Sequence, residues 1–253
     1  MNDRLTTKEY WRQIWKGASL PVIENPEYDV QKIFDNTLPK SDKISLIEIG
    51  CAPGAWMAYF NKYFGYSVAG IEYVDDAAAL TKRNMQIQGI RADVFNLDFF
   101  EADLDADSYD VVFSAGFIEH FEDLIGAVNK ITILAKQYVV TVVPNLYGLN
   151  GFISKVIRPK VFYSHKRIDK NLLRHLHEES GLYTLFCDYV GGLQFIMPAA
   201  HTAFSDKNKR FAKTINMPFK IFNLISKTFS KYANVCPKTK FLSMSLMYIG
   251  EKT

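Results

Sequence analysis

A glycine-containing turn and a single acid have the residue types and spacing that ligand binding requires, and each lies at the end of a short apolar run. The sharper one extends from Glu48 to Gly54 and reads Glu-Ile-Gly-Cys-Ala-Pro-Gly. It follows the apolar run 44–49 and precedes a helical pattern. Glycine lets the backbone turn tightly and lets a ligand approach without a Cβ in the way. Ligands of open parallel sheets bind beyond the carboxyl ends of the strands, so this turn predicts a binding site.

The second group is the acid Glu72, which ends the run Gly70-Ile71-Glu72. An acid about 20 residues after such a turn can accept hydrogen bonds from the two hydroxyls of a ribose. A solvated acid at a strand end is the alternative. The glycines are spaced G-x-x-x-G, which disfavours a dinucleotide site, and no Lys-Ser/Thr follows, which excludes a P-loop.

The elements that must position these residues alternate between short apolar runs and helical patterns. Such alternation predicts an α/β fold with a doubly wound, seven-stranded, mostly parallel sheet. We expect one domain over residues 1–253. The expected strands are 44–49, 67–72, 90–95, 109–114, 137–143, 182–190 and 241–250, with helices at 55–63, 76–88 and 123–135.

Additions surround this predicted core sheet of 43–190 and 240–250. Residues 1–42 predict two helices, one opened by a Thr6–Glu9 capping box and one starting at Asn25-Pro26. Residues 145–168 are expected to be irregular and to cover the acceptor side with 191–239, which should be mostly helical. Asp169 should cap a further helix that Gly181 ends.

Composition excludes several classes of protein. The net charge of +3 does not demand a nucleic-acid partner. Three cysteines without ligand spacing favour free thiols in a reducing compartment and predict no metal site. Residues 1–8 are too polar for a signal peptide, so a cytoplasmic location is expected. Basic and apolar residues alternate over 207–231, which predicts either peripheral contact with an anionic membrane or a solvated helix.

The motifs in order resemble those of class I S-adenosylmethionine-dependent methyltransferases. Glu48 to Gly54 is similar to the family's first motif, with Ala52 at the middle glycine, and the strand 109–114 is similar to its Phe/Tyr-Asp-Val-Val strand. The resemblance implies S-adenosylmethionine as cofactor and S-adenosylhomocysteine as product. It also implies that the cofactor is held by Glu48, Gly50, Cys51, Ala52, Gly54, Glu72, Tyr73, Asp98, Phe99, Ser114 and Ala115.

Within that resemblance, Asp98 accepts a hydrogen bond from the adenine amino group, and Phe99 lies beside the ring. Asp93 is a rival for this role, because the end of its strand is uncertain by a few residues. The segment Asp-Phe-Phe at 98–100 is similar to the family's Gly-Asp-Phe form, with Leu97 in place of the glycine, so Asp98 is preferred.

The acceptor side resembles methyltransferases that act on small molecules, sugars and quinone precursors. A histidine near the transferred methyl is the natural base for an oxygen or nitrogen acceptor, and the candidates are His165 and His120. A surface histidine at 165 and a helix-start pair at Glu119 and His120 are the alternatives. Substrate contacts are expected from Phe117, Asn145 and Tyr147. The acceptor is therefore predicted to be a small molecule, a sugar or a lipid-linked precursor.

Two further functions stay open at this point. A nucleotide-dependent oxidoreductase could use a similar sheet, and a non-catalytic module could keep the cofactor site alone. Nucleic-acid acceptors are disfavoured. The segment after residue 114 lacks the Asn/Asp-Pro-Pro-Tyr/Phe of enzymes that methylate base amines, no Lys-Asp-Lys-Glu set of ribose methyltransferases is matched, and Cys236-Pro237 is misplaced for a cytosine nucleophile.

Overall fold

The computed structural model describes residues 4–157, 159–192, 221, 225, 228 and 238–253. Seven strands form one sheet in the order β3-β2-β1-β4-β5-β7-β6. Only β7 runs antiparallel to its neighbours β5 and β6. The predicted sheet is thus confirmed, with strands β1 Ser45–Ile49, β2 Ser67–Ile71, β3 Ala92–Phe95, β4 Tyr109–Ala115, β5 Ala135–Pro144, β6 Leu182–Val190 and β7 Ser245–Lys252.

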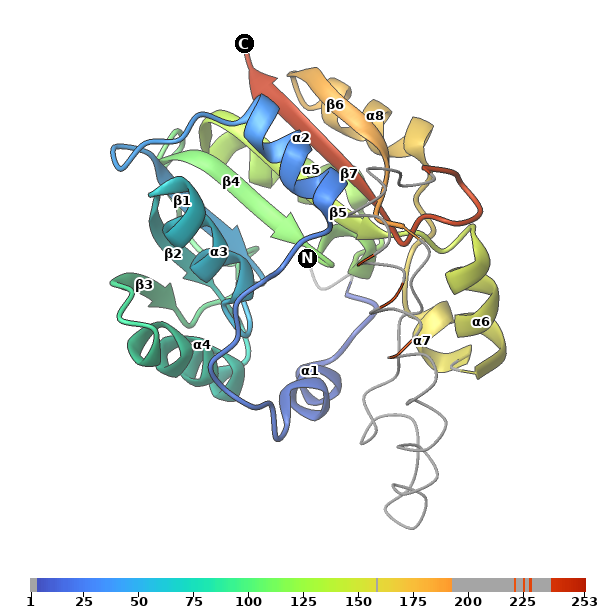
Figure 1. Cartoon of the computed structure of the whole chain (residues 1–253), viewed down its shortest axis with the longest axis horizontal. Coiled ribbons are helices and arrows are strands. Elements are labelled where there is room, and N and C mark those ends of the chain that lie inside the picture. Colours follow the sequence, from blue (N-terminus) through green and yellow to red (C-terminus); the bar gives the residue numbers. More distant parts are fainter. Residues whose placement is uncertain (1–3, 158, 193–220, 222–224, 226–227, 229–237) are drawn as a thin grey trace.

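Helices cover both faces of the sheet (Figure 1). On one face α2 (Tyr28–Thr37), α3 (Ala55–Phe64) and α4 (Asp75–Ile87) contribute to a core that includes Leu46 and Phe113. On the other face α5 (Leu124–Leu134) and α8 (Lys170–Glu179) pack against a core that includes Ile47 and Val112. Successive strand residues therefore enter opposite cores, which explains why the strands read as continuous apolar runs.

The carboxyl ends of β1, β2, β3 and β4 share one edge of the sheet, and the additions gather there (Figure 1). Helix α1 (Lys8–Trp15) lies apart from the two cores beyond this edge. Arg12 anchors it through an ion pair of 2.7 Å with Asp75 at the start of α4. Residue Arg4 pairs with Phe121 in an isolated antiparallel bridge, so the N-terminal segment crosses the end of β4.

Three local expectations were wrong. Thr7, not Thr6, caps α1, because its side chain accepts the Tyr10 N–H, while Thr6 accepts the Trp11 indole N–H instead. The stretch 145–168 is not irregular: it forms α6 (Leu149–Ile157) and α7 (Pro159–Tyr163). The last strand starts at Ser245 rather than 241.

Helix α6 was not recognised in the sequence because Gly148 and Gly151 lie at its start. Gly151 is required by the packing of the chain. A Cβ on Gly151 would stand 2.0 Å from the Leu146 carbonyl oxygen, so only glycine lets this turn approach so closely. The other predicted features near this segment hold: Asp169 caps α8 by accepting the Leu172 N–H, and Gly181 follows the helix with φ +85°.

The predicted helical insertion at 191–239 lies outside the described residues for nearly all of its length, as does most of the basic segment 207–231. Among the described residues, no helix combines the length and the apolar character that crossing a bilayer requires.

Candidate active site

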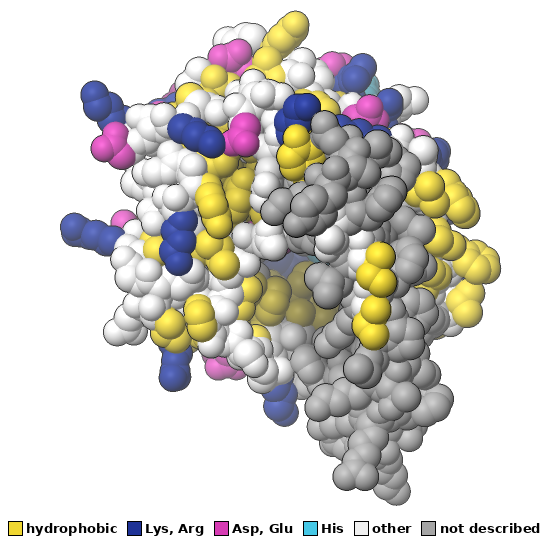
Figure 2. All heavy atoms as spheres, in the orientation of Figure 1, with side chains coloured by type: hydrophobic (Ala, Val, Ile, Leu, Met, Phe, Trp, Pro, Cys, Tyr) yellow, Lys and Arg dark blue, Asp and Glu magenta, His cyan; other side chains and the backbone are white. Residues whose placement is uncertain are grey.

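A cavity of about 540 Å³ opens at the carboxyl edge of the sheet. Figure 2 shows a hollow near the middle of one face, with hydrophobic side chains on its floor. Its walls come from the ends of β1, β2 and β4, from α1 and from α7. The residues predicted to bind the cofactor that line it are Glu48, Gly50, Ala52, Glu72, Tyr73, Phe99 and Ala115.

The turn after β1 is built around two glycines in the left-handed region. Gly50 has φ +73° and Gly54 has φ +84°. The N–H groups of Gly50 and Cys51 both donate to the Ile71 carbonyl, at 2.9 and 3.1 Å. A Cβ on Gly50 would lie 3.1 Å from the ring of Phe117, and one on Gly54 would crowd α4. The first glycine therefore keeps space in the cavity, and the second keeps α3 close to α4.

Glu48 is buried beneath this turn and also serves the fold. Its carboxylate accepts the Met57 N–H at 3.2 Å, in the first turn of α3. Burial raises the pKa of Glu48 well above its usual range, although the Met57 hydrogen bond acts in the opposite direction. Glu48 therefore has two roles: it accepts a backbone N–H at the start of α3, and it lines the cavity. The same side chain fixes the turn and forms part of the ligand site.

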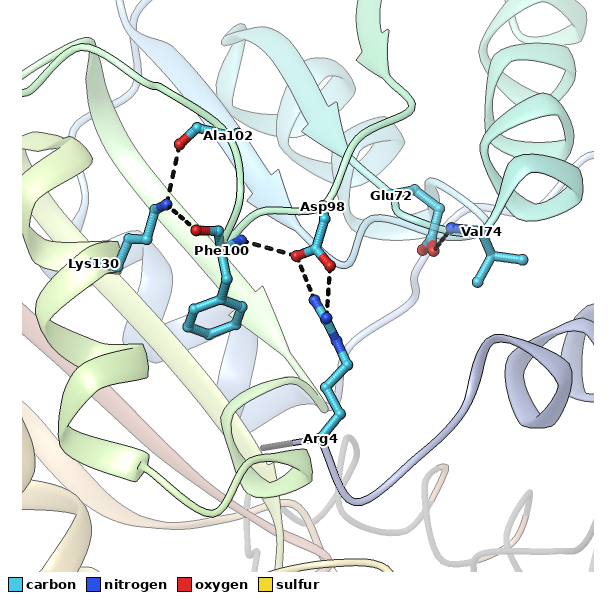
Figure 3. A network of polar contacts seen from close by, with 7 residues as sticks. All are labelled: Arg4, Glu72, Val74, Asp98, Phe100, Ala102 and Lys130. Atoms are coloured by element: carbon cyan, nitrogen blue, oxygen red, sulfur yellow. Dashed lines mark hydrogen bonds and ion pairs between the residues drawn. The ribbon is translucent and has the colours of Figure 1, made fainter. Parts of the chain in front are cut away.

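Glu72 stands at the end of β2 with its carboxylate against the next turn of the chain. It accepts the Val74 N–H at 2.9 Å (Figure 3). The backbone carbonyl of Glu72 accepts the Asn96 side-chain amide at 2.9 Å. Burial raises the pKa of Glu72, while the N–H groups of Val74, Ala52 and Tyr73 favour the carboxylate. The acid is thus fixed in orientation rather than solvated, and it lines the cavity.

Asp98 follows β3 and is held by Arg4 in a two-pronged ion pair (Figure 3). The guanidinium donates to the two carboxylate oxygens at 2.6 and 2.5 Å, and the Phe100 N–H adds a bond of 2.9 Å. Partial burial would raise the pKa of Asp98, but Arg4 and the Phe100 N–H outweigh it and hold the pKa below its usual range. The rival Asp93 is exposed on β3.

An aromatic cluster lies beside Asp98. Phe99 is 2% exposed and meets Phe117 edge to face, with ring centroids 5.9 Å apart. The Lys130 ammonium lies 5.4 Å from the centroid of the Phe99 ring. It also donates to the Phe100 and Ala102 carbonyls (Figure 3). Tyr73 stacks against the Arg4 guanidinium at 4.6 Å. These rings form an apolar slot next to a carboxylate, which suits a planar heterocycle with an amino group.

Several predicted site residues do not present their side chains to the cavity. Cys51 is buried and faces Gly70, where a Cβ would come within 2.6 Å of its sulfur. Ser114 is buried at the end of β4, and its hydroxyl has no hydrogen-bond partner among the described residues. Ala115 and Phe117 do line the cavity. For Cys51 and Ser114, only the backbone is in a position to take part.

Asn145 and Tyr147 lie outside the cavity, contrary to the expected substrate contacts. The Asn145 amide donates to the Lys240 and Ser243 carbonyls at 2.8 Å each, so it ties the loop after β5 to the segment before β7. Tyr147 is 41% exposed, with the Lys240 ammonium 4.6 Å from its ring. From this loop, Leu146 reaches the cavity instead.

Both candidate bases meet at the far end of the cavity, together with Glu119. The rings of His120 and His165 have centroids 4.2 Å apart. The Lys166 N–H donates to the Glu119 carbonyl at 2.7 Å, which ties the His165 loop to the segment after β4. His165 Nδ1 lies 2.6 Å from the Val161 carbonyl oxygen, so the proton sits on that nitrogen.

Burial dominates the titration of this cluster. It raises the pKa of Glu119 to about 8 and lowers the pKa of His120 to about 3, in the second case assisted by His165. Neither carboxylate oxygen of Glu119 has a hydrogen-bond partner among the described residues. Glu119 and His120 lie in the short 3-10 helix Ile118–His120, and both side chains are buried and line the cavity.

The N-terminal helix supplies cavity residues that the sequence motifs did not point to. Tyr10, Trp11, Ile14 and Trp15 all line the cavity, and Trp11 packs edge to face on His120 at 4.9 Å. None of the residues of α1 is fully buried. A short helix with such large aromatic residues and no place in the sheet was the available signal that it covers a site.

The comparisons with known proteins agree with this geometry. Residues 46–137, which extend from β1 into β5, match the family model described as a methyltransferase domain. No protein of curated function matches the sequence.

Solved structures share the fold at low identity. A methyltransferase dependent on S-adenosylmethionine from Archaeoglobus fulgidus is 16% identical, with TM-score 0.57 and coverage of 98% of this chain and 100% of that one. Geranyl diphosphate C-methyltransferase from Streptomyces coelicolor is 10% identical, with TM-score 0.59 and coverage of 89% and 78%. The [4+2]-cyclase SpnF is 11% identical, with TM-score 0.61 and coverage of 98% and 97%.

The seven-stranded, mostly parallel sheet is the fold that the methyltransferase resemblance implied. Residues 46–137 thus match a methyltransferase domain, and the chain has the fold of class I S-adenosylmethionine-dependent methyltransferases.

Proposed function

We propose that this enzyme transfers the methyl group of S-adenosylmethionine to an oxygen or nitrogen of a small, largely apolar acceptor. One observation carries the proposal. A single cavity contains the glycine turn and Glu72 on one side and the cluster of Glu119, His120 and His165 on the other. Methyl transfer from a sulfonium is an in-line displacement, so cofactor and acceptor must share one enclosed space.

The cofactor is assigned to the side of the turn. Glu72 accepts hydrogen bonds from the ribose hydroxyls, and Gly50 and Ala52 let the methionine part approach the backbone. The adenine lies in the aromatic slot, with its amino group toward Asp98. Support comes from the fixed carboxylate of Glu72, from the space that Gly50 leaves beside Phe117, and from Phe99 in the cavity wall.

The acceptor is assigned to the region between α1 and α7. Its walls are mainly aromatic and aliphatic, from Trp11, Trp15, Phe121, Leu146 and Phe162. Such walls favour an aromatic or isoprenoid body over a bare sugar, and the few polar groups would orient the nucleophile.

His165 is the better candidate for the base. Its Nδ1 proton is bound by the Val161 carbonyl, so Nε2 carries the basic lone pair. His120 is a poor proton acceptor near neutral pH, because burial lowers its pKa to about 3. In this arrangement the acceptor proton moves to His165 Nε2 as the new bond to the methyl carbon forms and the sulfonium bond breaks.

The test combines binding with transfer. Calorimetric titration should show micromolar binding of S-adenosylmethionine and S-adenosylhomocysteine. Incubation with cofactor carrying a labelled methyl group, and a panel of phenols, isoprenoid alcohols, amines and sugars, should label the apolar nucleophiles first. Failure to bind either cofactor form while folded, or tight binding of NADH instead, would contradict the proposal. Tight cofactor binding without transfer to any acceptor would favour the non-catalytic module.

A further inference from the structure

Three side chains of the types that bind transition metals meet in the acceptor half of the cavity. Each of Glu119, His120 and His165 offers one ligand atom, and these atoms all lie within 4.8 Å of one another. Glu119 and His120 follow β4, whereas His165 follows α7, so the fold brings together residues that are distant in sequence. Figure 1 places the end of β4 and α7 at the same edge of the sheet.

Glu119 and His120 both have polar atoms without a hydrogen-bond partner among the described residues. Glu119 Oε1 lies 3.8 Å from His120 Nε2, which is too long for a hydrogen bond. Both oxygens of Glu119 and the Nδ1 of His120 have no hydrogen-bond partner among the described residues, although the two side chains are 1% and 5% exposed. A buried carboxylate without a partner is costly, and a cation among the three groups would remove that cost.

The groups around the three side chains are also those expected around a metal ion. A histidine that binds a metal usually donates its other ring N–H to a carbonyl or carboxylate. His165 Nδ1 contacts the Val161 carbonyl at 2.6 Å, and the centroid of its ring lies 4.2 Å from that of His120. The Lys166 N–H to Glu119 carbonyl bond holds the two segments in register, and Trp11 packs on His120.

We propose that Glu119, His120 and His165 form a binding site for a divalent transition metal ion. Two imidazoles and one carboxylate favour Zn²⁺, Co²⁺ or Fe²⁺ over Mg²⁺ and Ca²⁺, which prefer oxygen ligands alone. Two ligand atoms about 2.1 Å from one ion at tetrahedral angles lie about 3.4 Å apart, so shifts of about 1 Å close the cluster.

The site would keep an open position toward the cavity. Three protein ligands with a vacant direction are typical of catalytic rather than structural metal sites. All three residues line the acceptor cavity, so an acceptor hydroxyl could be the remaining ligand. This role rests on the proposed function and replaces the base role given there to His165: in the metal-bound enzyme His120 and His165 are ligands, and the acceptor proton passes to solvent. Metal binding itself does not depend on the acceptor.

The proposed site contains no cysteine, so the cysteine spacing from which no metal site was predicted does not bear on it. No local spacing pattern marks it, because its third ligand comes from a separate helix hairpin.

Co²⁺ alone is the probe, since its visible d–d absorption reports nitrogen and oxygen ligation directly. Full-length metal-free protein should bind one equivalent of Co²⁺ with such absorption, and Zn²⁺ should displace it whereas Mg²⁺ should not. His165→Ala and Glu119→Gln should each weaken Co²⁺ binding at least about 100-fold. His175→Ala is the matched control, because His175 is 66% exposed on α8 and remote from the cavity lining.

Calorimetric binding of S-adenosylhomocysteine to each variant checks that the fold is intact and keeps the two proposals separate. Absorption that is absent in the wild type, or equal in wild type and His165→Ala, overturns the metal site while cofactor binding persists. Loss of cofactor binding in a wild type that still takes up Co²⁺ would instead count against the proposed function.

Discussion

The guanidinium of Arg4 spans the carboxylate of Asp98, with its two terminal nitrogens 2.6 and 2.5 Å from the two oxygens. Arg4 also lies over the Tyr73 ring at 4.6 Å and lines the cavity. The residue assigned to the adenine amino group is therefore already paired with the N-terminal segment. The Leu5 N–H to His120 carbonyl bond of 2.8 Å extends the same segment toward the acceptor side.

We expect Arg4→Met to tighten binding of S-adenosylhomocysteine about threefold. In the wild type the Asp98 oxygens must give up their ion pair with Arg4 before they can accept the adenine amino group. Breaking a partly exposed ion pair of this kind costs about 0–1 kcal/mol, which sets the size of the expected effect. Calorimetry on wild type and variant measures this. Asp98→Ala should weaken binding in either background. If Arg4→Met instead weakens binding, Arg4 holds the cofactor and does not compete with it.

Glu72→Ala should raise the dissociation constant of S-adenosylmethionine about 10- to 100-fold, because two hydrogen bonds to a charged acceptor are lost. Asp93→Ala is the matched control, since Asp93 is an exposed acid at the neighbouring strand β3. Its dissociation constant should equal that of the wild type. Equal affinities of wild type and Glu72→Ala, with the fold intact by circular dichroism, would remove Glu72 from the site.

Gly50→Ala and Gly89→Ala separate backbone strain from crowding of the cavity. Both glycines have positive φ, +73° and +68°, so each substitution should destabilise the fold by about 1–2 kcal/mol in thermal or urea unfolding. Only at Gly50 does the new Cβ meet a neighbour, the Phe117 ring at 3.1 Å, whereas Gly89 has open space. Cofactor binding should therefore be lost in Gly50→Ala and kept in Gly89→Ala; loss in both would show that the strain alone is responsible.

His177 should make the protein less stable as the pH falls. Burial lowers its pKa to about 4, and it bonds Thr141 and the Leu173 carbonyl at 2.8 Å each. In the unfolded state His177 takes up its proton below about pH 6.5, whereas in the folded state it does so only near pH 4. The stabilisation that neutral His177 gives the fold is therefore complete above about pH 6.5 and is lost as the pH falls toward about 4. Between pH 7 and pH 5 the loss should be about 2 kcal/mol.

Urea unfolding at both pH values, in wild type and His177→Gln, measures that loss. The variant should be less stable at pH 7 but should lose less stability on acidification than the wild type. The same dependence on pH in both proteins would assign the acid sensitivity to other groups. His120 would then be the first candidate, because it is also a buried histidine with a lowered pKa.

The sequence alone was sufficient to predict the sheet and to place the candidate cofactor residues at its edge. Strands such as β1 and β4 are short, apolar on both faces and bounded by turn residues, so they are recognisable one at a time. Glu48, Gly50 and Glu72 lie at the carboxyl ends of neighbouring parallel strands, and that topology alone brings them to one edge. Their positions follow from order along the chain.

The acceptor side depended on tertiary packing. His120 and His165 were recognised as residue types, yet only the bond between Lys166 and the Glu119 carbonyl and the packing of α7 make them neighbours. Asn145 was expected in the site for its place after β5, but its amide donates to the Lys240 and Ser243 carbonyls and does not line the cavity.

The cover of the site was also decided by tertiary structure. In the sequence α1 is an amphipathic helix without a defined partner, and its place over the cavity comes from Arg12 with Asp75 and from Arg4 with Asp98. Contacts between segments so far apart in the chain leave no local pattern, because each partner alone resembles an ordinary surface residue. The local sequence pattern therefore determined the sheet and the residues at the carboxyl ends of its strands. Contacts between distant segments determined which elements, such as α1 and α7, cover that edge of the sheet.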